Sequence, residues 1–192
     1  MLTELKRTDW TYVESKEAAK LIRKQLKAHF PGVKFSVTSD YNSINIRYTD
    51  GPSVKDVEAV AYQYKGGGFD GMIDLDYSTK SWLMPDGTAI PAHSGGTEGS
   101  MGSVPAFDTD RPSPEAQYVQ FSCKYISVSR NTSRAHLEAV AAAFEAKYGR
   151  PAAPIKGSDD SAYFELYAME FDNMQDRNSY EHFLQEMVRA AA

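Results

Sequence analysis

The sequence has little cysteine, no long apolar run and no clustered histidine, and each absence excludes a class of protein. Cys123 is the only cysteine among 192 residues, which excludes a disulfide-stapled secreted scaffold and a zinc site built on several thiolates. No run of about 18 apolar residues exists, so a membrane-spanning helix is excluded. The first residues, MLTELKRTDW, carry charges where a signal peptide has its apolar stretch. We therefore expect a cytoplasmic protein with no membrane partner.

The charge is weakly acidic and unevenly distributed. The net charge is −5, yet residues 1–50 carry nine Lys or Arg against six Asp or Glu. Binding to a phosphate backbone relies on clustered cations, so the acidic balance of the remaining chain argues against a nucleic-acid partner. The basic residues of the first predicted helix form the one plausible contact for nucleic acid. The alternative interpretation is a solvated helix face whose lysine stems pack along the edge of the core.

Two kinds of hydrophobic periodicity predict an α+β protein. Residues 14–30 place Ala18, Ile22, Leu26 and Phe30 on one helical stripe. Residues 34–39 and 43–48 alternate apolar and polar residues, which predicts a β-hairpin. A turn at 50–53 then leads into a second helix that stops at the glycines of 66–68. The opening unit is thus α-β-β-α.

The remaining chain predicts a loop-rich middle followed by β-α-β-α. Residues 69–116 show few periodic runs, and 85–116 is especially rich in Gly, Ser and Pro. Residues 118–129 predict a long strand, 131–148 a helix, 162–169 a strand, and 179 onward a final helix. We expect a single domain over 1–192, with an antiparallel sheet covered by helices on one face. Limited proteolysis should cut first between His93 and Ala106.

Several residues are candidates for a functional site, each with a structural alternative. Asp70, Asp74 and Asp76 could hold Mg²⁺ or contact a partner, although the same alternation is typical of a half-exposed strand. Trp82 is either a core residue or an anchor for a partner protein. The weak catalytic candidates are His93, as a general base, and Glu98; a flexible surface loop is the alternative for both. The glycines at 66–68 follow a helix and lack phosphate-loop spacing, so we interpret them as a helix stop. Beyond these weak candidates, we predict no catalytic residue, no metal site and no cofactor.

Four segments together resemble a known family. The segments AAKLIRKQLKAHFPGVKFSV (18–37), INIRYTDGPSVKDVEAV (44–60), GFDGMIDL (68–75) and SGGTEGS (94–100) are similar, in residues and in order, to the large polyvalent protein-associated domain of type 29. The resemblance covers roughly residues 14–148. The hairpin loop around Asp40–Ser43 is shorter than the insertion typical of the family. The resemblance implies an origin in phage or plasmid proteins that help incoming DNA against host defences, and it carries over no catalytic residue.

These observations favour a binding protein over an enzyme. We expect a counter-defence protein, of anti-CRISPR or anti-restriction type, that obstructs a host defence protein by surface contact through Asp70, Asp74, Asp76 and Trp82. The alternative is a small enzyme acting on nucleic acid or a nucleotide, with its site in residues 69–100. The sequence does not name the oligomeric state.

Overall fold

The computed structural model describes residues 10–99 and 101–190. The chain folds into two compact units. Unit 1 comprises residues 1–46 and 55–128, and unit 2 comprises residues 47–54 and 129–192. The expectation of one domain over 1–192 stays a prediction.

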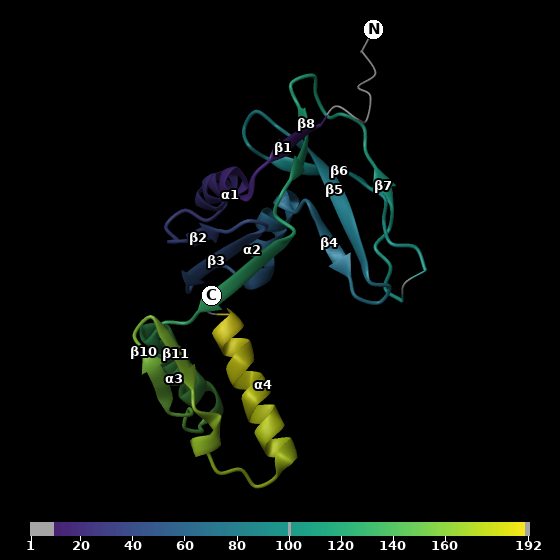
Figure 1. Cartoon of the computed structure of the whole chain (residues 1–192). Coiled ribbons are helices and arrows are strands. Elements are labelled where there is room, and N and C mark those ends of the chain that lie inside the picture. Colours follow the sequence, from purple (N-terminus) through teal and green to yellow (C-terminus); the bar gives the residue numbers. More distant parts are fainter. Residues whose placement is uncertain (1–9, 100, 191–192) are drawn as a thin grey trace. The chain divides into compact units, whose positions relative to one another are not determined.

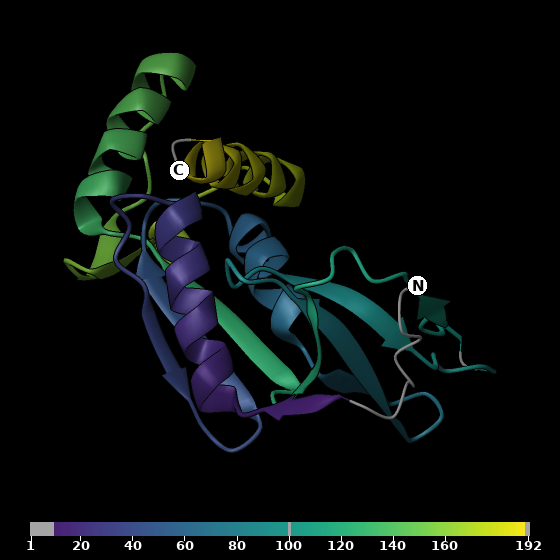
Figure 2. The same cartoon turned by 90° about the horizontal axis from the view of Figure 1, so that it is seen from above.

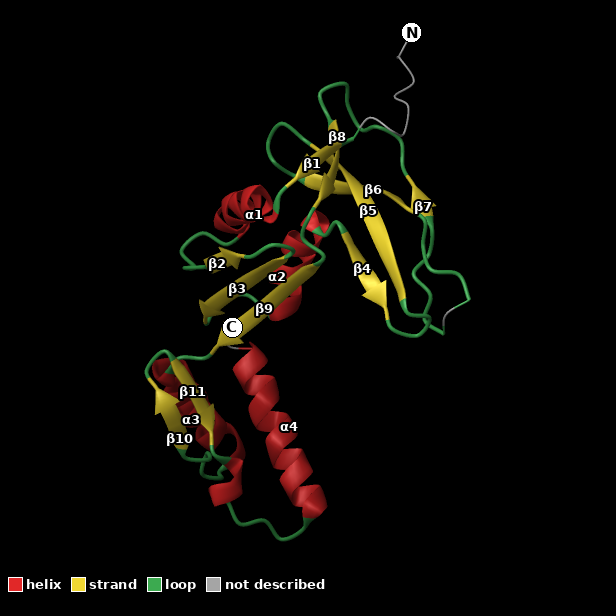
Figure 3. Cartoon of the chain, in the orientation of Figure 1, coloured by secondary structure: helices red, strands yellow, loops and turns green. Residues whose placement is uncertain are grey.

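Unit 1 is built on a six-stranded sheet and a second, three-stranded sheet (Figures 1 and 3). The large sheet has the order β1-β8-β5-β6-β7, and β4 pairs with the free part of β5. Its strands are β1 (Thr11–Val13), β4 (Gly67–Asp70), β5 (Leu75–Leu83), β6 (Ala89–Ser94), β7 (Phe107–Asp108) and β8 (Gln117–Phe121). The small sheet has the order β2-β3-β9, with β2 (Ser36–Ser39), β3 (Ser43–Thr49) and β9 (Tyr125–Asn131). Strands β3 and β9 each begin in unit 1 and end in unit 2.

The helices of unit 1 bury the stripes that the sequence predicts. Helix α1 (Ser15–His29) buries Ala18, Ile22 and Leu26 and lies along β2 (Figure 2). Helix α2 (Val54–Ala61) continues into a 3₁₀ turn, Tyr62–Tyr64. The Tyr64 ring is fully buried, meets Phe121 edge-on at 5.4 Å, and donates its hydroxyl to the Gly87 carbonyl at 2.6 Å. The core of unit 1 is therefore aromatic at the place where α2 meets the large sheet.

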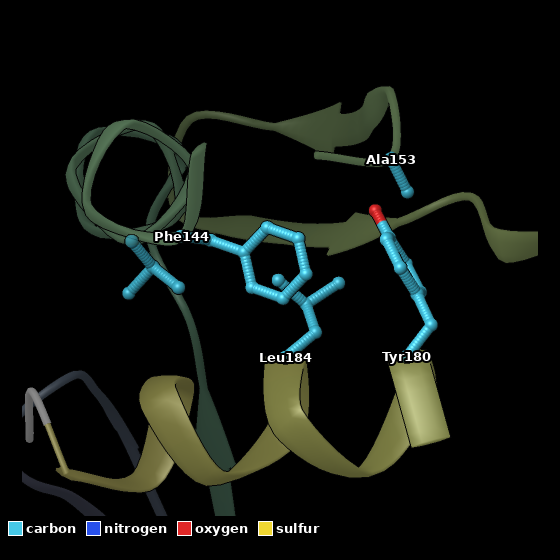
Figure 4. Close-up of a cluster of buried hydrophobic side chains, with 5 residues drawn as sticks. Phe144, Ala153, Tyr180 and Leu184 are labelled. Atoms are coloured by element: carbon cyan, nitrogen blue, oxygen red, sulfur yellow. The ribbon is translucent and has the colours of Figure 1, made fainter. Parts of the chain in front are cut away.

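Unit 2 packs two helices and a short hairpin around its own core. Its elements are α3 (Arg134–Tyr148), β10 (Ile155–Ser158), β11 (Ser161–Phe164), the 3₁₀ turn Leu166–Ala168, and α4 (Met174–Ala190). Ser133 caps α3 by accepting a hydrogen bond from the His136 N–H, and Gly149 ends the helix in the left-handed conformation. Figure 4 shows Tyr180 and Leu184 pointing from α4 toward Phe144 of α3. This cluster is fully buried and apolar, so it holds the two helices together.

The α+β prediction is confirmed, and the structure differs from the expectation in four places. The strand predicted over 118–129 is two strands, β8 and β9, which belong to different sheets. The break lies at Ser122–Lys124, where the backbone bonds to three other segments: Ser122 N–H to Val13, Lys124 N–H to Asn42, and the Cys123 carbonyl to Gly66. The apolar alternation of the sequence continues through Tyr125, but Tyr125 is 50% exposed and Ile126 is buried, so the buried face shifts by one residue at the break.

The second difference lies in the middle of the chain. Residues 69–116 contain all of β5 and β6, which the sequence pattern did not predict. Both strands are partly buried on both faces and β5 has a bulge at Lys80 and Ser81, so neither shows a clean alternation. The third difference is a parallel pair, β1 with β8, beside otherwise antiparallel strands of the large sheet. The fourth is the strand predicted over 162–169, which is β11 (Ser161–Phe164) followed by the 3₁₀ turn Leu166–Ala168.

Candidate functional site

An exposed apolar segment of unit 1 lies at the tip of the β4–β5 hairpin, whose backbone is drawn in Figure 3. Residues 71–74 form a four-residue loop between the paired ends Asp70 and Leu75. Four large apolar side chains, each 37–61% exposed, lie within this tip: Phe69, Met72, Ile73 and Leu75. Such a concentration differs from the singly scattered apolar residues that are normal on a protein surface. We call these four side chains, with Asp74 and Asp76, the hairpin tip.

The three aspartates of this segment have different roles. Asp70 is mostly buried, and its Oδ1 accepts a hydrogen bond from the Met72 N–H at 3.0 Å, which closes the turn. Asp74 is exposed and has a left-handed backbone with φ of 53°. Asp76 is exposed and its Oδ2 lies 2.6 Å from Lys124 Nζ. The hairpin therefore presents Asp74 and Asp76 to solvent, whereas Asp70 shapes the turn.

Three glycines hold the base of the hairpin against its neighbours. A Cβ at Gly66 would lie 1.6 Å from the Phe121 carbonyl oxygen, and one at Gly67 would lie 2.2 Å from the Tyr77 carbonyl oxygen. The Tyr77 ring covers Gly68, where a Cβ would lie 2.6 Å from the Tyr77 hydroxyl. Gly67 and Gly68 belong to β4 and not to a helix end. The helical segment does end just before these glycines, at Tyr64. Close approach to Phe121 and Tyr77, for which only glycine has room, is a further requirement at these positions.

Trp82 is a core residue. Its side chain is 7% exposed, its ring lies 4.8 Å from that of Tyr118, and its Nε1–H donates to the Thr109 carbonyl at 3.3 Å. This burial supports the core alternative, and the role of Trp82 in partner binding stays a prediction.

His93 and Glu98, the catalytic candidates, lie on different kinds of structure. His93 is half-buried on β6 and pairs across to Asp108 on β7, with 3.9 Å between Nδ1 and Asp108 Oδ1. That distance exceeds a hydrogen bond, and His93 Nδ1 has no hydrogen-bond partner. Glu98 is exposed in a turn after β6. Asp108 is the acidic neighbour of His93 that sequence reasoning missed, since the two are far apart in the sequence.

The loop that carries Glu98 is tied down at its base. The Thr97 N–H donates to the Val104 carbonyl at 2.9 Å, and the Val104 N–H donates to Thr97 Oγ1 at 2.8 Å. Ser94 and Thr97 are buried, whereas Glu98 and Met101 are exposed. The exposed part of the segment is therefore shorter than the sequence suggests.

The basic face of α1 contacts its own unit at several points. The Arg23 guanidinium donates to the Val37 carbonyl, Lys24 Nζ donates to the Asp86 carbonyl, and Lys20 pairs with Glu17. These contacts support the interpretation of a solvated helix face. Among residues 10–99 and 101–190, no group of three or more His, Cys, Asp or Glu side chains lies close enough to hold a metal ion.

Cys123 is buried in the core of unit 1. Its thiol donates to the Tyr64 carbonyl at 2.9 Å, and burial raises the pKa of this thiol to about 11. A thiol with so high a pKa is poorly nucleophilic at neutral pH. Cys123 is therefore a structural residue of the core.

The fold and this surface define an α+β protein with an exposed hairpin. Comparison with known families identifies its family. The chain belongs to the large polyvalent protein associated domain 29 family, whose model matches residues 13–133. The domain is associated with polyvalent proteins of phages and plasmids. The match covers most of unit 1 and ends at the residue before α3.

No curated protein and no solved structure matches the chain. None of the helices in the described part of the chain is long and apolar enough to cross a membrane.

Proposed function

We propose that this protein is a counter-defence protein of a phage or plasmid that binds a host defence complex and obstructs it by protein–protein contact. An anti-CRISPR or anti-restriction protein would act in this way. The family supports the mobile-element context. The exposed apolar hairpin tip is the observation that supports the contact.

The hairpin tip has the composition of a binding epitope. Clustered exposed apolar side chains are typical of protein interaction sites. About half of each side chain is exposed, so its complete burial in a complex would contribute roughly 1 kcal/mol, near half the value for a fully transferred residue. The carboxylates of Asp74 and Asp76 lie beside these side chains. The matching surface on the partner is an apolar groove with basic residues at its rim.

A single exposed methionine tests this contact. Met72 at the tip is 61% exposed, and Met174 in unit 2 is 68% exposed. We expect Met72→Asp to abolish capture of the partner from host lysate, because a carboxylate in an apolar contact is left desolvated without a partner. Met174→Asp, an equally exposed change, should leave capture intact. Captured proteins are identified by mass spectrometry and compared between the two variants.

The counter-defence role requires a biological readout. The protein is expressed in hosts that carry a restriction or a CRISPR system, and the efficiency of plasmid transformation is measured. We expect the wild type and Met174→Asp to raise the efficiency and Met72→Asp to fail. Equal protection by both variants would refute the role of the hairpin, and no protection by the wild type in any such host would refute counter-defence.

The exposed carboxylates provide a second test of the same surface. Asp74→Asn should weaken capture and change its salt dependence, because the charge that meets the basic rim is lost while Asn keeps the left-handed backbone at this position. Asp56→Asn, on α2, is the matched control of the same charge change. Equal loss in both variants would point to net charge and not to the hairpin.

The enzymatic alternative is tested separately. If His93 acts as a general base, His93→Ala should abolish protection while leaving the free energy of unfolding nearly unchanged. Under the binding proposal the same substitution should be mild.

A further inference from the structure

A polar cavity opens at the place where three segments of unit 1 meet. The segments are the junction of β1 and α1, the β2–β3 loop, and the link between β8 and β9. The cavity has a volume of about 540 Å³, which is within the range of small-molecule sites. It is separate from the candidates His93 and Glu98, neither of which lines it.

The floor of this cavity is fixed by a chain of hydrogen bonds. Ser15 is buried and its hydroxyl donates to the Tyr41 carbonyl at 3.0 Å. Ser122 Oγ lies 2.7 Å from Ser15 Oγ. The single hydroxyl proton of Ser15 is already donated to Tyr41, so the Ser122 hydroxyl is the donor in this pair. The lone pairs of Ser122 Oγ are left to accept a hydrogen bond from a ligand. The Lys124 N–H donates to the Asn42 carbonyl at 2.9 Å, which joins the third segment to the same floor.

The walls carry three kinds of group. The residues that line the cavity include two exposed tyrosines, two lysines and two acidic residues: Tyr12, Tyr41, Lys16, Lys124, Glu14 and Asp40. Tyr41 is 91% exposed and Tyr12 is 56% exposed. Exposing an aromatic ring to water is unfavourable, so these rings are available to stack on a ligand. Lys124 is held in place by its ion pair with Asp76 at 2.6 Å.

This combination selects among ligand classes. An inorganic anion would leave the tyrosine rings unused and would face two carboxylates. A cationic side chain would face Lys16 and Lys124. A ligand that carries a flat ring, several hydroxyl donors and one anionic group can contact the tyrosines, the acidic residues and the lysines together. We propose that the cavity binds a nucleotide, either free or within single-stranded nucleic acid.

Each part of a nucleotide then has a matching group. The base stacks on the rings of Tyr12 and Tyr41, as bases do on exposed aromatic side chains. The sugar hydroxyls donate to the carboxylates of Glu14 and Asp40, and the phosphate pairs with Lys16, whereas Lys124 already pairs with Asp76. The lysines are few, so the phosphate interaction is weak and screened by salt.

The proposal is tested by titrating the purified protein, without any partner, with nucleoside monophosphates, nucleosides, inorganic phosphate and a short single-stranded oligonucleotide. Isothermal titration calorimetry gives the affinities. We expect at least one monophosphate to bind with a Kd below about 1 mM and phosphate alone to bind more weakly. An oligonucleotide that binds much more tightly than its monomer would identify the source as nucleic acid, and equal or weaker binding would identify a free nucleotide.

Matched variants locate the binding. Tyr41→Ala should weaken the affinity about five- to hundred-fold, because a stacking platform is lost. Tyr167→Ala is the control, since Tyr167 in unit 2 is 89% exposed and lies outside the cavity. Lys16→Ala should weaken a monophosphate about two- to five-fold and leave the nucleoside unchanged, whereas Lys27→Ala on the same helix should change neither.

Three results would overturn the proposal. They are the absence of binding by every nucleotide and oligonucleotide, equal affinity in Tyr41→Ala and Tyr167→Ala, and binding of inorganic phosphate as strong as that of a monophosphate. Because no partner is needed, the outcome is independent of whether the hairpin tip binds a host protein.

Discussion

A methyl group added at Gly66 should test how the hairpin is anchored. The added Cβ would lie 1.6 Å from the Phe121 carbonyl oxygen, and real Cβ contacts essentially never fall below 3.0 Å. The two segments must therefore separate by at least 1.4 Å, the difference between these distances. Both are backbone, so no side chain can rotate away.

The cost follows from what this separation breaks. The Gly66 N–H donates to the Cys123 carbonyl, and the Gly66 carbonyl accepts from the Thr79 N–H, each at 2.9 Å. Loss of both hydrogen bonds lowers the free energy of unfolding by about 1–3 kcal/mol. Overpacking by the added methyl group lowers it by about 1–3 kcal/mol more. The lower entropy of the unfolded alanine chain offsets less than about 1 kcal/mol. We expect Gly66→Ala to lower the free energy of unfolding by about 4 kcal/mol.

Urea denaturation followed by circular dichroism measures this loss. Gly95→Ala is the matched control, because nothing lies within 4 Å of a Cβ at Gly95 and its backbone is not left-handed. That variant should stay within about 1 kcal/mol of the wild type. If Gly66→Ala also stays within about 1 kcal/mol, the close approach of Gly66 to Phe121 is not present in the folded protein and the reasoning is wrong.

Four other positions test the burial of single side chains and the exposure of one loop. Cys123, with its pKa raised to about 11 by burial, should react with a thiol reagent at pH 8 only after denaturation; rapid labelling of the native protein would contradict this. Partial burial and the Glu58 carboxylate raise the pKa of Tyr62 from 10 to about 12, so its contribution to stability is complete below pH 10 and is lost as the pH rises toward 12; Tyr62→Phe should flatten the unfolding free energy across that window. Leu184→Ala should cost about 2–5 kcal/mol because the side chain is buried in unit 2, while Phe183→Ala, at an exposed neighbour, should cost less in the same denaturation. Limited proteolysis should cut first beside the exposed Met101, and mass spectrometry that finds the first cut at Thr97 would refute this.

The sequence indicated the exposure of some residues of the hairpin tip and not of others. The segment FDGMIDLDY indicated a surface strand with carboxylates, and Asp74 and Asp76 are indeed exposed. The same segment contains Phe69, Met72, Ile73 and Leu75, whose exposure the residue pattern did not indicate. Their alternation with aspartates was the available signal. Apolar residues in a strand are normally buried, so pattern alone assigns them to the core.

Tertiary contacts decided the remaining assignments. Trp82 is buried because Thr109 and Tyr118, distant in the sequence, pack around it. The cavity beside Tyr12 and Tyr41 exists because three separate segments meet at Ser15 and Ser122. No periodicity encodes such a meeting.

By itself the sequence determined the α+β class and the stripe of α1, because helix periodicity is a local property. The sequence also predicted the third helix, over 131–148, although Asn131 ends β9 and α3 begins at Arg134. It also determined the family, through the residues of unit 1. Only the tertiary structure decided that Gly66–Gly68 serve close strand approach and that the strand around Cys123 divides between two sheets. It also decided that the hairpin tip is left uncovered. These features depend on which distant backbones come together, and that is settled by packing of the whole unit rather than by any short stretch of residues.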